Sequence, residues 1–145
     1  MAGKPRSFPI GPVSPNENFV TPEGLALIEA AHERAHAEHA AALASDDRAS
    51  LARAARDLRY WAARRASAQV LPAPPDTVQV HFGSTVTIKR DDGRRQTFRI
   101  VGEDEAEPTR GTLSYVAPLA RALMGKEVGD VVPMGEAEAE IVAIG

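Results

Sequence analysis

The chain has 145 residues, with 17 lysines and arginines against 20 aspartates and glutamates, and a formal net charge of −3. This length accommodates one ordinary domain or two small ones, and the negative charge argues against a general nucleic-acid-binding protein. The sequence contains no apolar run long enough to span a bilayer, no signal-peptide-like start and no cysteine. We therefore expect a globular protein without membrane association, disulfides or thiolate catalysis.

The first 19 residues are predicted to form a flexible tail. They contain Pro5, Pro9, Pro12 and Pro15. Proline lacks an N–H donor and interrupts both helices and sheets, so this segment does not favour regular structure.

Residues 20–71 are predicted to form an antiparallel helical hairpin. Thr21 can cap a helix and Pro22 suits its first position, whereas the Ser45-Asp46-Asp47 run favours a turn. Two helices of about 24 residues, joined by a short turn, lie antiparallel and span roughly 36 Å. The apolar positions that predict the helical faces are Leu25, Ile28, Ala31, Ala35, Ala42 and Leu43, then Leu51, Ala54, Leu58, Trp61 and Ala68.

A proline-rich linker at residues 72–77 separates this hairpin from a predicted strand-rich domain at residues 78–145. Asp91-Asp92-Gly93 is typical of a turn between two strands, and residues 136–144 alternate as a half-buried closing strand does. Pro118 favours the start of one short helix, which Gly125 can close. The fold class is therefore α+β, a helical hairpin followed by an antiparallel sheet with one short helix.

The charge is distributed unevenly between the two halves. Residues 1–75 carry nine basic against eight acidic side chains, whereas residues 76–145 carry eight against twelve, a net charge of −4. An acidic second half favours a basic protein surface as partner over a phosphate backbone.

Several motifs in the second half resemble the C-terminal domain of the bacterial Gre transcription factors, GreA and GreB, to which the Rnk regulator is related. The matching residues are Arg99–Gly102, Asp104–Ala106, Ser114, Pro118, Ala120–Leu123, Gly125, Lys126, Gly129 and Asp130, with Phe82–Thr87 fitting the family's first long strand. The resemblance implies an FKBP-like sheet domain and a cytoplasmic, monomeric accessory factor of bacterial RNA polymerase without catalytic residues of its own. It also implies that the hairpin, shorter here than in the family, enters the secondary channel.

Asp46 and Asp47 at the hairpin tip are the candidate metal ligands. In the family, tip acids lie beside the catalytic Mg²⁺ of the polymerase, so the factor would share a metal and hold no cofactor of its own. Asp47 fits the aspartate of the family tip pattern, whereas Asp46 replaces its glycine and Ser50 its glutamate. The alternative role for the tip acids is to turn the chain and cap the second helix.

The short segment before and within the C-terminal helix is the candidate polymerase-binding site. By resemblance it comprises Ser114, Val116, Ala117, Pro118 and Arg121, with Val116 and Ala117 replacing polar residues of the family.

The second helix is strongly basic. Its arginines either contact nucleic acid, such as nascent RNA, and the channel wall, or form a solvated face. They are Arg48, Arg53, Arg56, Arg59, Arg64 and Arg65, of which the first four are the candidate contacts.

Three other functions stay open from the sequence. An Rnk-like protein would occupy the channel as an antagonist without stimulating transcript cleavage. An FKBP-like prolyl isomerase would need an aromatic pocket, for which Phe82, Phe98 and Tyr115 are available, although packing of the sheet core can absorb all three. A metal-binding module would use His32, His36 and His39, which share a helical face.

Overall fold

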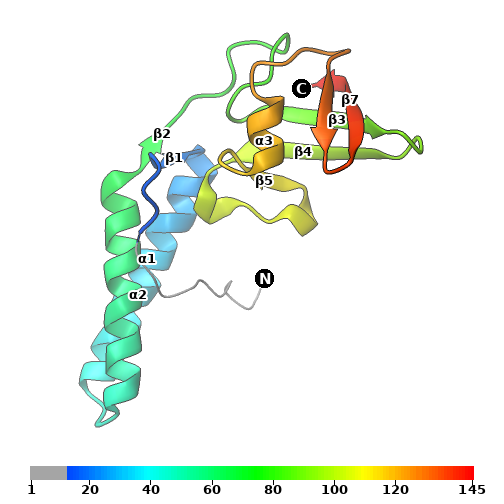
Figure 1. Ribbon diagram of the computed structural model, residues 1–145. Helices are drawn as coiled ribbons and strands as arrows, with labels where there is room; N and C mark the ends of the chain where they lie inside the picture. The colour runs from blue at the N-terminus through cyan, green and yellow to red at the C-terminus, as the bar shows by residue number, and fades with distance from the viewer. Residues whose placement is uncertain (1–12) are drawn as a thin grey trace. The chain divides into compact units, whose positions relative to one another are not determined.

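A computed structural model describes residues 13–145, so most of the predicted tail lies outside the described residues (Figure 1). The structure consists of two compact units. One contains Ile28–Ser67, and the other contains Asn16–Leu27 together with Ala68–Gly145. Within residues 13–145, no helix is both long and apolar enough to cross a membrane.

The helical unit is the predicted antiparallel hairpin of α1 (Pro22–Leu43) and α2 (Arg48–Ser67). The helices have 22 and 20 residues, which gives lengths of about 33 and 30 Å. The prediction that Leu43 faces the seam is wrong, because Leu43 is 61% exposed while its neighbour Ala42 is buried. Successive residues point about 100° apart on a helix, so both cannot face the partner. The buried seam residues are Ile28, Ala31, Ala35, Ala42 and Ala54.

The second unit contains a five-stranded sheet with the order β5-β4-β3-β7-β6. The three inner strands and β6 pair antiparallel, as predicted, whereas the short edge strand β5 pairs with β4 in parallel. The strands are β3 (Thr85–Arg90), β4 (Arg95–Val101), β5 (Thr112–Ser114), β6 (Val131–Met134) and β7 (Ala137–Ile144).

The core of this unit lies between the sheet and the short helix α3 (Pro118–Leu123), which covers one face of the sheet (Figure 1). Val86 and Ile88 of β3 are fully buried, because alternate residues of a strand point to the same face. Ala120 and Leu123 of α3 are also fully buried. The structure thus confirms the α+β class.

The predicted turn residues lie where the sequence places them. Gly93, between β3 and β4, has a φ of +86°, and Arg94 N–H donates to Asp92 Oδ1 over 3.0 Å. Gly125, which follows the end of α3, has a φ of +79°. Both values lie in the left-handed region that favours glycine.

A second, two-stranded sheet pairs β1 (Phe19–Val20) with β2 (Gln69–Val70) in parallel. The structure therefore corrects the expectation of a tail through residue 19, because Asn18 is only 2% exposed and Phe19 belongs to a strand. The segments next to the helices, assigned from the sequence to the hairpin, belong to the sheet unit. Backbone pairing between residues 50 positions apart is a tertiary effect that local propensity does not reveal.

Candidate functional site

The tip of the hairpin is a capped turn in which the two candidate metal ligands differ. Asp47 Oδ1 accepts hydrogen bonds from the N–H groups of Ala49 and Ser50 over 3.0 and 3.3 Å, and its Oδ2 accepts from the Ser50 hydroxyl over 2.6 Å. Asp47 is thus the N-cap of α2. Asp46 is exposed, and within the described part of the chain its carboxylate forms no hydrogen bond or ion pair.

The hydrogen bonds of Asp47 have an electrostatic consequence. The bond from the Ser50 hydroxyl, followed by the backbone N–H of the same residue, lowers the pKa of the Asp47 carboxyl below its ordinary value. Asp47 is therefore held as a carboxylate, and its oxygens serve the helix. Asp46 is the tip acid whose oxygens are available to an external ligand.

The four candidate contact arginines of α2 form one exposed face. At about 100° per residue they fall within an arc of about 140°, away from the seam. The other two arginines of this basic helix lie outside that face. Arg64 is only 1% exposed, whereas Arg65 is exposed and lines a groove between the two helices. The exposed face consists of Arg48, Arg53, Arg56 and Arg59.

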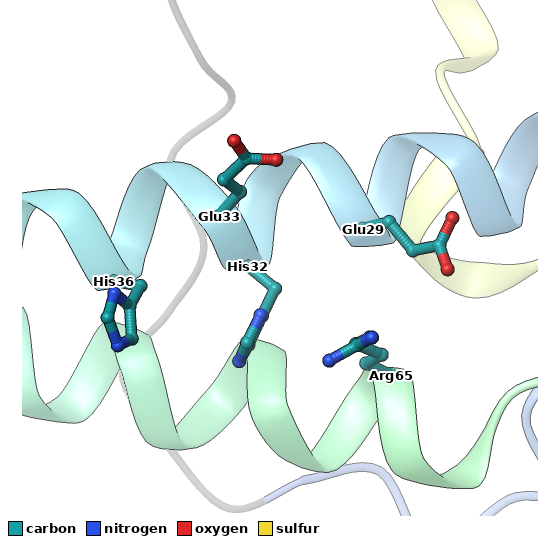
Figure 2. A pocket seen from close by; sticks show the side chains of 5 residues that line it. All are labelled: Glu29, His32, Glu33, His36 and Arg65. Atoms are coloured by element: carbon teal, nitrogen blue, oxygen red, sulfur yellow. The ribbon is translucent and has the colours of Figure 1, made fainter.

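The histidine face is a shallow groove between α1 and α2 (Figure 2). The rings of His32 and His36 lie 6.5 Å apart between centroids, and Arg65 extends from α2 toward His32. Glu29 and Glu33 line the same groove, but His39 does not. In residues 13–145 no group of three histidine or acidic side chains is arranged to hold a metal ion, so the structure gives the three-histidine hypothesis no support.

The candidate polymerase-binding segment begins at Ser114, the last residue of β5, and is anchored by backbone hydrogen bonds. Tyr115 N–H donates to Val101 O over 2.9 Å, and Ala117 N–H donates to Ser114 O over 3.0 Å. Ala117 is the N-cap of α3 and provides no side-chain cap. Pro118 occupies the first helical position, as predicted.

One face of this segment is presented to solvent. The side chains of Pro118 and Arg121 are exposed, whereas Ala120 and Leu123 of the same helix are buried in the core. The structure thus brings the five predicted residues into one turn of loop and one turn of helix, whose exposed side is available to a partner.

The structure reveals a cluster at the start of α1 that sequence reasoning missed. Thr21 N–H donates to Glu105 Oε2 over 2.9 Å, and the Thr21 hydroxyl donates to Glu105 Oε1. Gly102 N–H donates to the same Oε2 over 3.0 Å. Glu105 lies in the 3-10 helix η1 (Glu103–Glu105), which is followed by η2 (Pro108–Arg110). The one feature of the sequence that could have indicated this cluster is Gly24, a glycine in the first turn of a capped helix.

The aromatic residues considered for an isomerase pocket pack against each other and the core. The Phe82 and Tyr115 rings are 5.6 Å apart, and Phe19 of β1 lies 6.3 and 5.4 Å from them, respectively. The Tyr115 hydroxyl donates to Glu17 O. Phe98 also packs against the core. Packing in and against the sheet core therefore accounts for these rings, as expected from the sequence.

Comparisons with known proteins match the C-terminal part of the chain and, in one case, most of it. The family model described as "Transcription elongation factor, GreA/GreB, C-term" matches residues 75–145. The chain is 35% identical over 127 residues to the transcription elongation factor GreA of Desulfovibrio desulfuricans, an alignment that covers 82% of this chain and 76% of that protein. The chain belongs to the GreA/GreB family.

Other relatives align with about half of the chain. The chain is 46% identical over 72 residues to the transcription elongation factor GreB of Neisseria meningitidis serogroup B, covering 47% of this chain. It is 49% identical over 71 residues to GreA of Alkalilimnicola ehrlichii, covering 46% of this chain. These alignments span less than half of the relatives' own lengths, 44% and 45%.

Solved structures of similar proteins cover most of the chain. GreA factor homolog 1 of Thermus thermophilus aligns over 90% of this chain and 99% of its own, with 22% identity and a TM-score of 0.41. A GreA/GreB factor from Nitrosomonas europaea aligns over 88% of this chain and 98% of its own, with 19% identity and a TM-score of 0.42.

Proposed function

We propose that this protein is a Gre-like regulator of transcription elongation that binds bacterial RNA polymerase at the secondary channel. Its C-terminal domain would dock at the channel entrance and its hairpin would enter the channel, in the cytoplasm and as a monomer. Family membership supports this proposal, since the relatives compared above are named as transcription elongation factors. The protein would be an accessory factor, and catalysis would belong to the polymerase.

The observation that carries the proposal is the anchored segment with Pro118 and Arg121 exposed. Its backbone is fixed by β4 and β5, so presenting these side chains to a partner costs little conformational entropy. The sheet half is acidic, which favours a basic surface on the polymerase. Val116 and Ala117 provide no polar side chain, so docking would depend on Ser114, Pro118 and Arg121.

The hairpin tip would act in the channel. Mg²⁺ prefers oxygen ligands and commonly takes one or two carboxylates from a protein. The exposed carboxylate of Asp46 meets this requirement, whereas the Asp47 carboxylate meets it less well because it caps α2. A metal ion shared with the polymerase would activate the water molecule that cleaves RNA. The exposed arginine face of α2 would contact the channel wall or nucleic acid.

A second candidate function is an Rnk-like occupant of the channel that antagonises other factors without stimulating cleavage. The capping role of Asp47 favours it, because it leaves Asp46 as the single acid at the tip with uncommitted oxygens. The two functions share the docking site and differ at the tip.

The test combines polymerase binding with transcript cleavage in stalled elongation complexes. Arg121→Glu should weaken binding about tenfold or more, whereas Arg95→Glu, an exposed arginine on β4, should not. Cleavage that disappears in Asp46→Asn would identify a Gre-like factor. Binding without cleavage would identify the Rnk-like alternative, and a wild-type protein that binds no polymerase would refute both.

A further inference from the structure

The Glu105 carboxylate belongs to two N-terminal caps at once. In η1 it accepts the N–H of Gly102, its own N-cap residue, over 3.0 Å. In α1 it accepts the N–H of the N-cap residue Thr21 over 2.9 Å, and also the Thr21 hydroxyl proton. The Thr21 oxygen in turn accepts the N–H of Gly24 over 3.0 Å. One side chain thus accepts backbone N–H groups at the starts of two helices that are distant in sequence.

This arrangement replaces a missing part of the first helix. In a capping box, a glutamate at the third helical position reaches back to the N-cap N–H. That position in α1 is Gly24, which has no side chain, and Glu105 occupies the vacant space from another segment. A β-carbon on Gly24 would overlap the Glu105 carboxylate, and one on Gly102 would lie 2.5 Å from Phe19 O. Both glycines are therefore needed for the two segments to approach.

The backbone donors of the cluster belong to buried residues, while the Glu105 side chain is partly exposed. Thr21 is 2% exposed, and Gly24 and Gly102 are buried. Parallel backbone pairing completes it, because Gln69 N–H donates to Asn18 O over 2.8 Å and links the chain after α2 to the chain before α1. Buried N–H donors are costly to leave without an acceptor. The first turn of α1 is consequently held to the η1 turn.

We propose that Glu105 is a positioning residue for the hairpin, an inference that rests on the proposed function. Because α1 is one continuous helix from Pro22 to Leu43, fixing its first turn restricts the directions available to its later turns. The Glu105 carboxylate bonds to Thr21 and Gly102, and neither lies in the segment from Ser114 to Arg121. Although Phe19 and Glu17 contact Tyr115 of that segment, loss of the Glu105 carboxylate removes no hydrogen bond of the segment, so Glu105 serves placement of the tip and not docking.

The experiment uses the full chain and measures three quantities for each variant. They are hydrogen exchange of the Gly24 amide, affinity for the polymerase, and the effect on RNA elongation when the polymerase is saturated with the protein. Glu105→Gln and Thr21→Val disturb the cluster, and Thr21→Ser retains the hydroxyl. Glu138→Gln, an exposed glutamate on β7, is the matched control.

In Glu105→Gln and Thr21→Val, we expect the Gly24 amide to exchange about tenfold faster than in wild type. The effect on RNA elongation at saturating protein should fall about tenfold, while the affinity for the polymerase should stay within about twofold of wild type. Thr21→Ser and Glu138→Gln should behave as wild type. A full effect at saturation despite rapid Gly24 exchange would overturn the proposal, as would a loss of affinity parallel to the loss of effect. Unchanged Gly24 exchange would show that Glu105 does not hold the helix. If the wild type binds no polymerase, the proposed function fails and the positioning role fails with it. Exchange of the Gly24 amide would still show whether Glu105 and Thr21 hold the first turn of α1, an arrangement we call the clamp.

Discussion

The Thr21 hydroxyl donates a hydrogen bond to Glu105, 84 positions further along the chain, and accepts one from the N–H of Gly24. The hydrogen bond between Thr21 and Glu105 joins the first turn of α1 to the motif Gly102-Glu103-Asp104-Glu105, which is part of the sequence that resembles the family. The motif therefore has a structural explanation, since its glycine allows the approach and its last acid completes the cap.

Gly24→Ala should destabilise the protein, although glycine-to-alanine substitutions in helices usually stabilise by about 0.5–1 kcal/mol. The new β-carbon would displace the Glu105 carboxylate and leave buried donors unpaired, which costs about 1–3 kcal/mol. Urea unfolding of the full chain measures the difference.

The same substitution in a Glu105→Ala background provides the control. With the carboxylate absent, Gly24→Ala should be neutral or stabilising, so the two changes should be strongly non-additive. A stabilising Gly24→Ala in the wild-type background would contradict the structure.

Ala117→Ser should stabilise the sheet unit by about 0.5–2 kcal/mol. Ala117 is the N-cap of α3 and has no side-chain acceptor, whereas a serine hydroxyl can accept an N–H at the start of the helix. Thermal unfolding measures the gain. Ala122→Ser, within the same helix, should give no comparable gain, and equal effects of the two substitutions would exclude a capping explanation.

The hairpin should lose stability in acid through Asp47. Hydrogen bonds lower the Asp47 pKa below its unfolded value of about 3.9, so the stabilisation is fully present above that pH and is lost as the pH falls through the lower, folded pKa. Asp47→Asn, which still caps, should flatten the acid dependence of helix content measured by circular dichroism. Asp46→Asn is the matched control and should leave the dependence unchanged. Identical acid profiles for wild type and Asp47→Asn would count against this assignment. Glu23, Asp76 and Asp92 also have lowered pKa values, so some acid sensitivity will remain.

Phe19→Ala should destabilise the sheet unit by about 2 kcal/mol, because Phe19 packs against the rings of Phe82 and Tyr115. Near-ultraviolet circular dichroism of Tyr115 should change as well. Leu27→Ala, at a position 37% exposed, should cost much less. Equal costs would show that Phe19 is not part of the core.

Local chemistry in the sequence determined most of the secondary structure, with the β1–β2 pairing as an exception. The turn at Gly93, the helix start at Pro118 and the alternation of β7 each depend on the conformations that a few adjacent residues allow. The motif from Arg99 to Asp130 resembles the GreA/GreB family in sequence alone. These features require no knowledge of distant contacts.

Tertiary structure decided how these pieces combine and which candidate residues are available. At the tip, by contrast, local hydrogen bonds from Ala49 and Ser50 assign Asp47 to capping and leave Asp46 exposed. Arg64 has the local pattern of a surface arginine and is nevertheless buried.

The clamp at the start of α1 depends most completely on the tertiary structure. Thr21 alone predicts a cap, and Gly24 alone predicts only a weak point in a helix. Their role emerges when Glu105 fills the space that Gly24 leaves. Side-chain spacing along a helix or strand can be deduced from the sequence, whereas a contact between distant segments requires the fold that brings them together.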